Sequence, residues 1–247
     1  MSFRSQIAGV RRYAVSSLHK RTSALGELGP VVSFTFDDFP RSAFTVGSPL
    51  IERYGARATY YVAMGLMGKA NRLGEQFLSS DVHQLVERGH EAAIHGFSHL
   101  SARKSPLEAF IRDVNRGNDA LRRVTRNCSS GNFAYPYGEV TLSLKGRLGP
   151  QMASCRGAWG GFNGPAVDLN LLCANSLYGG LEQAESIRRL IRENEQSKGW
   201  LIFYTHDVAD HPSPFGCTPA LFEFAVSMAA GRGAKIMTVA DVVCNLK

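Results

Sequence analysis

Four short apolar runs of the sequence end in residues that could carry out chemistry. These residues are Asp37 and Asp38, His95 with His99 four positions later, Pro136 with Tyr137, and His206. In parallel β/α folds the carboxyl ends of the strands meet at one edge, where the following loops form a common cleft. If the four runs are strands of one parallel sheet, we expect these residues to share one rim.

The two histidines have the spacing of metal ligands. His95 and His99 are four residues apart, so one helical turn places both imidazoles on the same side. One carboxylate from Asp37 or Asp38 would complete a set of two histidines and one aspartate, which leaves positions for water and substrate. Gly96 follows His95, where zinc peptidases have glutamate, so a base must come from elsewhere, and Asp37 is available.

The other polar residues fit acid–base chemistry, although each also has a structural interpretation. Adjacent carboxylates raise each other's pKa unless a cation intervenes, and beside two histidines a cation site is favoured over an Asp-rich helix cap. His206 could protonate a leaving group, or its side chain could be satisfied by backbone groups alone. The remaining histidines are assigned to surface or structural roles: His19, His83, His90 and His211.

The order of the expected elements predicts an α/β fold. The strands are Val31–Phe36, Ala58–Ala63, Glu91–Ile94, Asn132–Tyr135, Met152–Cys155, Leu171–Ala174, Leu201–Tyr204 and Lys235–Thr238. The helices between them are Gly47–Tyr54, Ser80–Arg88, Pro106–Val124, Glu182–Ser197 and Pro219–Ala230. Strands alternating with helices imply parallel β-α units, which here fit a small or incomplete β/α barrel better than a doubly wound open sheet. No Gly-rich turn follows the first strand, so a nicotinamide enzyme is disfavoured.

The basic excess is concentrated at the start of the chain. The 247 residues carry a formal charge of +7. Residues 1–21 contain five basic residues and no acidic one, which leaves +2 on the rest and disfavours a nucleic-acid partner for the main body. The stripe of Phe3, Ile7, Val10, Ala14 and Leu18 predicts an amphipathic helix. Two interpretations remain open, peripheral contact with an anionic membrane surface and a cover over one end of the domain.

The chain divides into a basic helix and connector (1–30) and one domain (31–247). Its five cysteines are scattered without Cys-x-x-Cys spacing, so reduced thiols are expected. We find neither an apolar run of 18 residues nor a continuous apolar segment typical of a signal peptide. We therefore expect a cytoplasmic protein, which would be peripheral at the inner face of the membrane if residues 1–21 bind lipid. The oligomeric state is not predicted.

Taken together, the motifs resemble those of the polysaccharide deacetylase family, the NodB-homology group of carbohydrate esterases. The first motif is Thr35–Asp38, and the second is Gly89-His90-Glu91 followed by His95 and His99. The third is Tyr135–Gly138 and the last is Tyr204–Asp207. They occur in the order of the family and span roughly Val31 to the C-terminus.

This resemblance implies a distorted, incomplete barrel of about seven parallel strands that removes acetyl groups from N-acetylated sugars. It implies one divalent metal ion, usually Zn²⁺, with Co²⁺, Ni²⁺ or Mn²⁺ as alternatives. By analogy with the family, Asp38, His95 and His99 would bind the metal. Asp37 would be the base, His206 the acid, and the backbone N–H of Tyr137 would help to bind the oxyanion.

The sequence departs from the family pattern at several supporting positions. Gly96 replaces a serine or threonine, and Ala134 replaces an arginine that partners the base. Arg156 or Arg41 could substitute for that arginine. Further supporting candidates are Pro136, Tyr204 in place of an acyl-pocket leucine, Trp159 without an adjacent carboxylate, and Asp168 as a distant partner for His206.

Two other functions remain as alternatives. One is a hydrolase of a non-sugar amide, such as a ureide or formamide, on the same scaffold. The other is a carbohydrate-binding protein without catalysis, which would have no need for both Asp37 and His206 beside a metal site. Metal content and acetate release from N-acetylated sugars would separate the three.

Overall fold

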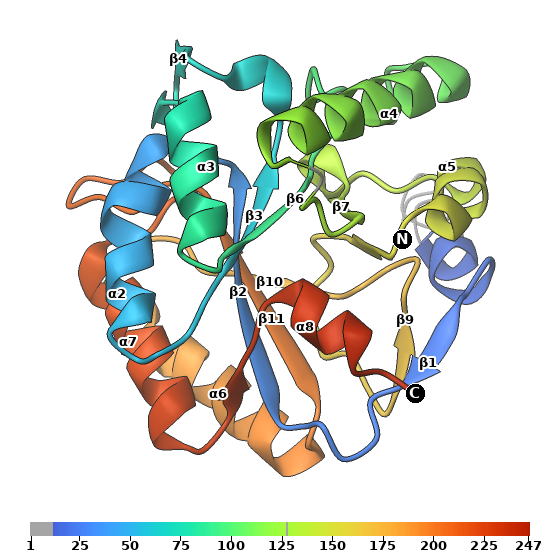
Figure 1. Ribbon diagram of the computed structural model, residues 1–247. Helices are drawn as coiled ribbons and strands as arrows, with labels where there is room; N and C mark the ends of the chain where they lie inside the picture. Colours follow the sequence, from blue (N-terminus) through green and yellow to red (C-terminus); the bar gives the residue numbers. More distant parts are fainter. Residues whose placement is uncertain (1–11, 127) are drawn as a thin grey trace, which may run out of the picture.

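Seven parallel strands form a curled sheet at the centre of the molecule (Figure 1). The computed structural model describes residues 12–126 and 128–247. The strand order is β10 (Asn175–Ser176), β11 (Trp200–Thr205), β2 (Val31–Asp38), β3 (Thr59–Val62), β6 (Glu91–Ile94), β7 (Asn132–Ala134) and β8 (Ser154–Arg156). A short strand, β12 (Lys235–Ile236), also pairs in parallel with the start of β2. The prediction of an incomplete barrel of about seven parallel strands is confirmed.

Helices cover the outer face of this sheet. They are α2 (Ser48–Glu52), α3 (Ser79–Glu87), α4 (Leu107–Val124), α5 (Leu142–Leu148), α6 (Ala184–Ser197) and α7 (Pro219–Gly231). The last helix, α8 (Val239–Cys244), instead packs Val239 and Val242 with Val31 and Trp200 on the interior side. In Figure 1, α2, α3, α6 and α7 lie on one side of the strands, and α4 and α5 lie beyond β6 and β7. The buried residues of α4 recur at three- and four-residue intervals, which is why this helix packs with one face inward.

The central strand β2 connects the core to the site. Its eight residues are all buried, as expected for a strand covered on both faces. Side chains alternate along a strand, so Phe34 and Phe36 point to the same face. There both rings pack against Phe222 of α7, with ring centroids 5.4–5.6 Å apart. Burial of each such ring contributes about 2 kcal/mol to folding. Thr35 and Asp37 therefore face the barrel interior.

The segment before the barrel is attached to the domain. Residues 12–17 are helical, and the buried Lys145 donates a hydrogen bond to the carbonyl oxygen of Val15 (2.8 Å). Strand β1 (Thr22–Ala24) then pairs antiparallel with β9 (Ala166–Asp168). Of the predicted apolar stripe, Phe3, Ile7 and Val10 lie outside the described residues. Leu18 is 51% exposed, whereas Val15 is buried, so in the described part Val15 covers the domain instead of Leu18.

Several predicted boundaries differ from the structure. The predicted strand Leu171–Ala174 makes only an isolated parallel bridge between Leu172 and Arg156, and the last strand of the sheet is instead β10. The predicted helix Gly47–Tyr54 is α2, preceded by a π-helical turn at Ala43–Gly47. Neither α5 nor α8 was predicted, nor was the hairpin formed by β4 (Ala70–Asn71) and β5 (Gly74–Glu75).

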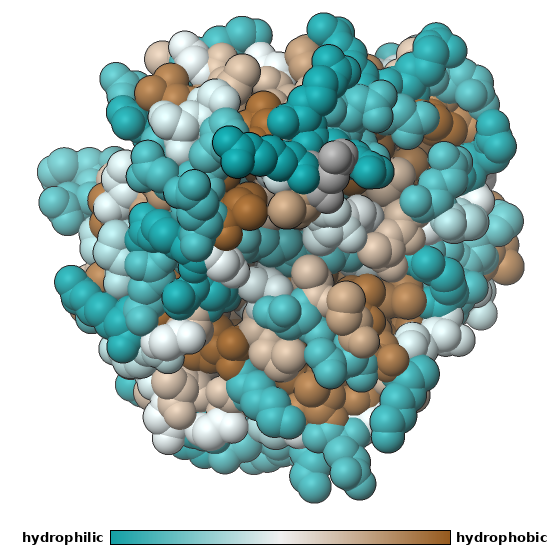
Figure 2. All heavy atoms as spheres, in the orientation of Figure 1, coloured by the Kyte–Doolittle hydropathy of each residue, from teal (hydrophilic) through white to brown (hydrophobic). Residues whose placement is uncertain are grey.

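The molecular surface is mostly hydrophilic on the face shown in Figure 2, where hydrophobic residues form small separate patches. Within residues 12–126 and 128–247, none of the helices has the length and apolar character needed to span a membrane. The five cysteines are unpaired, and Cys155 and Cys217 are buried in the core. Burial raises the pKa of each of these two thiols to about 12, so both are packed as neutral side chains.

Candidate active site

A cavity of ≈ 280 Å³ lies at the carboxyl ends of the parallel strands. It is lined by Asp37, Asp38, Arg72, Leu73, His95, His99, Tyr137, Gly138, Ala158, Tyr178, Tyr204, His206 and Phe215. All six residues predicted to act in metal binding or catalysis are in this set, together with the supporting candidate Tyr204. The structure thus brings together residues that are up to 169 positions apart in the chain.

Three side chains converge as ligands of one ion would. Oδ1 of Asp38 lies 3.1 Å from Nε2 of His99 and 3.6 Å from Nε2 of His95. One potential ligand atom from each of the three residues lies within 4.8 Å of the others. Oδ1 of Asp38 is buried and accepts no hydrogen bond from any described residue, which is costly unless a cation or a donor satisfies it.

The protonation of the two histidines suits this role. Nδ1 of His95 donates to the carbonyl oxygen of Ala134 (2.9 Å), so the lone pair is on Nε2, which faces Asp38. Burial lowers the pKa of His95 to about 3 and that of His99 to about 4, partly opposed by the charge of Asp37. Both rings are therefore neutral at pH 7. Burial also raises the pKa of Asp38 to about 6 in the metal-free protein.

Left-handed backbone conformations are concentrated in the site. The φ angles of Asp38, His99 and Tyr137 are 63°, 53° and 59°. This region is uncommon for residues other than glycine, and strained backbone of this kind often occurs at functional sites. The aromatic ring of Tyr137 packs edge-on against His99, with ring centroids 4.5 Å apart.

Helix α4 holds the loop that carries His99. The carboxylate of Asp113 accepts hydrogen bonds from the backbone N–H groups of Phe97 and Ser98 at 3.0 Å. A Cβ atom added to Gly96, which has a φ of +76°, would lie 3.0 Å from the same carboxylate. A serine or threonine at position 96 would therefore crowd Asp113. Asp113 on α4 thus holds the loop by hydrogen bonds, a task that a serine or threonine side chain at position 96 would otherwise share.

The candidate base is paired with a buried arginine. Nη2 of Arg156 donates to Oδ1 of Asp37, and both side chains are almost completely buried. Nη1 of Arg156 donates to the carbonyl oxygen of Gly157, and the guanidinium lies about 5 Å from the ring centroids of Tyr61 and Tyr204. Burial alone would raise the pKa of Asp37, but the charge and hydrogen bond of Arg156, together with the nearby His95 and His206, outweigh burial, and the net pKa is lowered.

The register of the sheet explains why the base has a partner although Ala134 is not an arginine. Residues 132–134 of β7 pair in parallel with residues 154–156 of β8, so Ala134 and Arg156 are direct neighbours across the two strands. Neighbours in register point to the same face, and here that face is the barrel interior. Arg156 thus reaches Asp37 from one strand further along the sheet. Arg41, the other option, instead pairs with Asp81 at 3.0 Å.

The candidate acid is held by a backbone carbonyl. Nδ1 of His206 lies 3.1 Å from the carbonyl oxygen of Phe215, which also accepts a hydrogen bond from the backbone N–H of His206. With Nδ1 donating, Nε2 is available to the cavity. Asp207 closes the loop between them, because its carboxylate accepts hydrogen bonds from the N–H and Oγ of Ser213.

Three sequence candidates lie elsewhere. Asp168 is wrong as a partner of His206, because its carboxylate pairs with Lys145 at 2.7 Å and accepts from the N–H of Arg21. Trp159 does not line the cavity, and its ring lies under Arg12 at 5.1 Å, while the adjacent Ala158 takes the lining position. Pro136 is buried at the start of the turn that carries Tyr137.

Several lining residues were not predicted as site residues, among them Tyr178, Phe215 and Arg72. Tyr178 and Phe215 come from loops without a recognisable motif. Arg72 lies at the tip of the β4–β5 hairpin, where Gly68, Asn71 and Gly74 signal a turn but not its position in space.

Comparisons with known proteins agree with this geometry. The sequence profile described as Polysaccharide deacetylase matches residues 27–148. No match was found among the curated proteins. Among solved structures, the chain is similar to a T48 deacetylase with substrate, at 18% identity and a TM-score of 0.58, with 89% of this chain and 94% of that chain covered.

Two further solved structures have the same fold. The family 4 acetyl xylan esterase from Clostridium thermocellum in complex with a cobalt ion is 18% identical, with a TM-score of 0.60 and coverage of 87% and 90%. The peptidoglycan deacetylase PdaC from Bacillus subtilis is 15% identical, with a TM-score of 0.54 and coverage of 87% and 91%. The profile assigns residues 27–148 to the polysaccharide deacetylase family, and the solved structures share the fold of the half-barrel.

Proposed function

We propose that this protein is a metal-dependent hydrolase that removes N-acyl groups, foremost acetyl, from an amino sugar of a glycan. The observation that carries the proposal is the convergence of Asp38, His95 and His99 beside the Asp37–Arg156 pair in one cavity. The match of residues 27–148 to the polysaccharide deacetylase profile supports it. So does the cobalt ion in the similar acetyl xylan esterase.

The residues present fit a divalent cation. Two neutral imidazoles and one carboxylate are a donor set that suits Zn²⁺ and Co²⁺ and leaves coordination positions for substrate. The buried, unsatisfied Oδ1 of Asp38 lacks a partner that such an ion would provide. When bound, the ion would polarise the acyl carbonyl and lower the pKa of a water molecule.

The residues of the chain then have separate tasks. Asp37, kept as a carboxylate by Arg156, accepts the proton of the attacking water. His206, with Nδ1 held by the carbonyl of Phe215, donates a proton from Nε2 to the departing sugar amine. The N–H of Tyr137 stabilises the negative charge that develops on the carbonyl oxygen. Tyr204 and Tyr178, whose rings are 5.5 Å apart, form one wall of the cavity and restrict the space for the acyl group.

This arrangement argues against a protein without catalysis, whereas the choice between a glycan and a non-sugar amide depends on the substrate panel. Burying the charges of Asp37 and Arg156 costs desolvation free energy. A carbohydrate-binding protein without catalysis would gain nothing in return for that cost. A hydrolase of a ureide or formamide would use the same residues, so the substrate panel must include such compounds.

The test is acetate release by metal-loaded protein from chitotetraose, peptidoglycan fragments, acetylated xylan and a linear ureide. We expect release from an N-acetylated glycan. Removal of the metal with a chelator should abolish activity, and Zn²⁺ or Co²⁺ should restore it. Release from the ureide alone, or from acetylated xylan alone, would replace the proposed substrate class.

Variants separate the roles. His99→Ala should lose both bound metal, measured by elemental analysis, and activity. Asp37→Asn should retain the metal and lose at least about 100-fold in kcat, the usual contribution of a positioned base. Asp119→Asn, on the exposed face of α4, is the matched control and should match the wild type. Unchanged turnover in Asp37→Asn would overturn the mechanism.

A further inference from the structure

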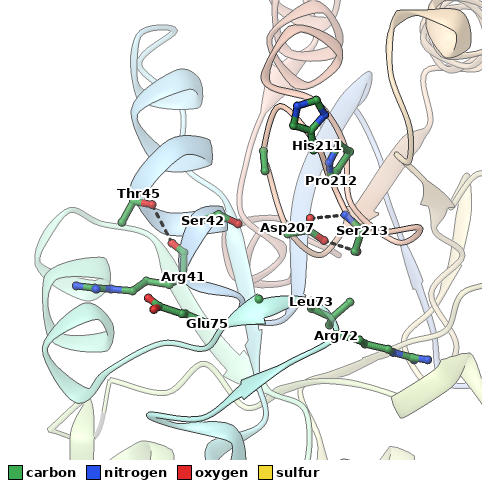
Figure 3. Close-up of a pocket in the computed structure, with 12 residues that line it drawn as sticks. Arg41, Ser42, Thr45, Arg72, Leu73, Glu75, Asp207, His211, Pro212 and Ser213 are labelled. Carbon is green, nitrogen blue, oxygen red and sulfur yellow. Dashed lines mark hydrogen bonds between the residues drawn. The ribbon is translucent and has the colours of Figure 1, made fainter.

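An arginine stands at the boundary between the catalytic cavity and a second pocket. The second pocket has a volume of ≈ 520 Å³ and is drawn in Figure 3. Arg72 and Leu73 line both spaces, so a substrate that extends from the catalytic cavity into the second pocket must pass Arg72. The mechanism described above does not use this residue.

The hairpin fixes the position of Arg72. Asn71 pairs with Gly74, so Arg72 and Leu73 form a two-residue turn between β4 and β5. Oδ1 of Asn71 accepts hydrogen bonds from the N–H of Leu73 (2.8 Å) and from Nε2 of Gln76 (3.2 Å). Leu73 is itself buried. The turn that carries Arg72 is therefore held in place by hydrogen bonds and by the burial of Leu73.

The side chain of Arg72 is also positioned. Its guanidinium lies 4.9 Å from the ring centroid of Phe215, a residue whose carbonyl oxygen holds the candidate acid His206. A cation above an aromatic ring gains roughly 1 kcal/mol and loses side-chain freedom. Among the described residues, no carboxylate lies within ion-pair distance of Arg72.

Two of the charged groups that line the second pocket are already engaged. Arg41, in the same pocket, is paired with Asp81, and the buried carboxylate of Asp207 accepts two hydrogen bonds from Ser213. Figure 3 shows Glu75 on the side of Arg41, and Arg72 extending to the opposite side of the pocket. His211 lines the pocket from the loop above and adds a further basic group. Arg72 is thus a positioned cation without an ion-pair partner among the described residues, and it lies beside the loop that holds the candidate acid His206.

We propose that Arg72 binds an anionic group, a carboxylate or a phosphate, on the substrate unit next to the N-acyl sugar, so that the enzyme prefers anionic glycans. This inference rests on the proposed function and narrows its substrate class. Arginine suits the task because its planar guanidinium donates two parallel hydrogen bonds to a carboxylate or phosphate. The contact with the ring of Phe215 does not use the N–H groups of the guanidinium, which donate to no described residue.

The experiment compares matched substrates that differ in charge. A hyaluronan tetrasaccharide is measured against the same tetrasaccharide with its carboxylates methyl-esterified, and N-acetylglucosamine 1-phosphate against methyl N-acetylglucosaminide. In at least one pair we expect kcat/KM to be higher for the anion by about tenfold or more, the usual effect of a charge-assisted hydrogen bond. The pair that shows the preference identifies carboxylate or phosphate. Added salt should weaken the preference.

Arginine variants assign the preference. Arg72→Gln should reduce the ratio of anionic to neutral kcat/KM towards one, and Arg72→Lys should retain part of it. Arg188→Gln is the matched control, because Arg188 also lies over a phenylalanine, Phe224, but lines neither space. A wild-type ratio near one in both pairs, or an undiminished ratio in Arg72→Gln, would overturn the inference.

Binding separates this inference from the proposed function. If no N-acetylated compound is hydrolysed, the proposed function fails, and calorimetric titration of the same four compounds still tests Arg72. Tighter binding of an anion that is lost in Arg72→Gln would support the anion site. Equal binding of charged and neutral partners would reject it. Hydrolysis without any charge preference would reject the inference and leave the proposed function in place.

Discussion

Replacing Arg156 by methionine should move the acidic limb of the activity profile to higher pH. The guanidinium is the group that keeps the pKa of Asp37 low in spite of burial. Methionine fills similar space without charge, so burial would be opposed only by His95 and His206, and the pKa of Asp37 would rise. At any pH below the new pKa, more of the base would be protonated and inactive.

The size of the effect follows from the burial of the pair. Removing one partner of a buried ion pair typically costs about 3–5 kcal/mol, because the other charge is left without compensation. Since one pKa unit corresponds to about 1.36 kcal/mol, the lower figure predicts a shift of about two pH units. Below the shifted limb, kcat/KM should fall about 100-fold, and raising the pH should restore much of it.

The assay is kcat/KM against pH for metal-loaded wild type, Arg156→Met and the double variant Arg156→Ala with Ala134→Arg. Position 134 is the cross-strand neighbour of position 156, so the double variant returns a guanidinium to the same interior face. It should move the limb back towards that of the wild type. Metal content controls for loss of the site. If folded, metal-loaded Arg156→Met kept the wild-type limb, Arg156 would not be the group that sets the pKa of Asp37.

Three other predictions concern stability. The buried carboxylate of Glu91 accepts four hydrogen bonds at the end of the barrel away from the site. Glu91→Ala should therefore lower the free energy of unfolding, measured by urea titration, by about 3 kcal/mol or more. A loss under about 1 kcal/mol would contradict this. Burial lowers the pKa of His90 in the folded protein, in spite of its contact with Glu52. As the pH falls below about 6.5, the imidazole is therefore protonated in the unfolded chain before it is protonated in the folded one, and the free energy of unfolding should decrease. His90→Gln should make the stability difference between pH 7.5 and 5.5 smaller, and an equal difference would count against the reasoning. Arg21→Ala should expose residues 12–24 to proteolysis and cost about 2 kcal/mol, because Arg21 donates to the carbonyl oxygens of Met152 and Ala153; an unchanged digestion pattern would show that these bonds do not hold the segment.

The sequence predicted the site best where an apolar run ends in a polar residue. Asp37, His95 and His206 each end an apolar run, and the parallel sheet brings the ends of such runs together. The run Leu171–Ala174 has the same composition, yet its side chains enter the core without a strand pairing beyond one bridge. Burial favours apolar residues in strands and in packed loops alike, so composition could not separate the two.

The supporting residues could not be predicted, because they depend on register and on backbone atoms. Choosing Arg156 over Arg41 requires knowing that positions 134 and 156 are neighbours across β7 and β8. The partner of His206 is the carbonyl of Phe215, and every residue has a carbonyl, so no residue type marks it. Arg72 lies in a two-residue turn whose place above the cavity is set by tertiary packing.

The left-handed backbone at three site positions limits how this enzyme can be re-engineered. At Asp38, His99 and Tyr137 a β-branched or bulky replacement meets a conformational cost of roughly 1–2 kcal/mol before any change in chemistry, whereas asparagine or glycine does not. Libraries that aim to alter metal preference are therefore effectively narrow at 38 and 99. Asp37, His95 and Arg156 have no such backbone restriction. Directed evolution should find new variants more readily in the walls of the cavity than at the ligands on the turns.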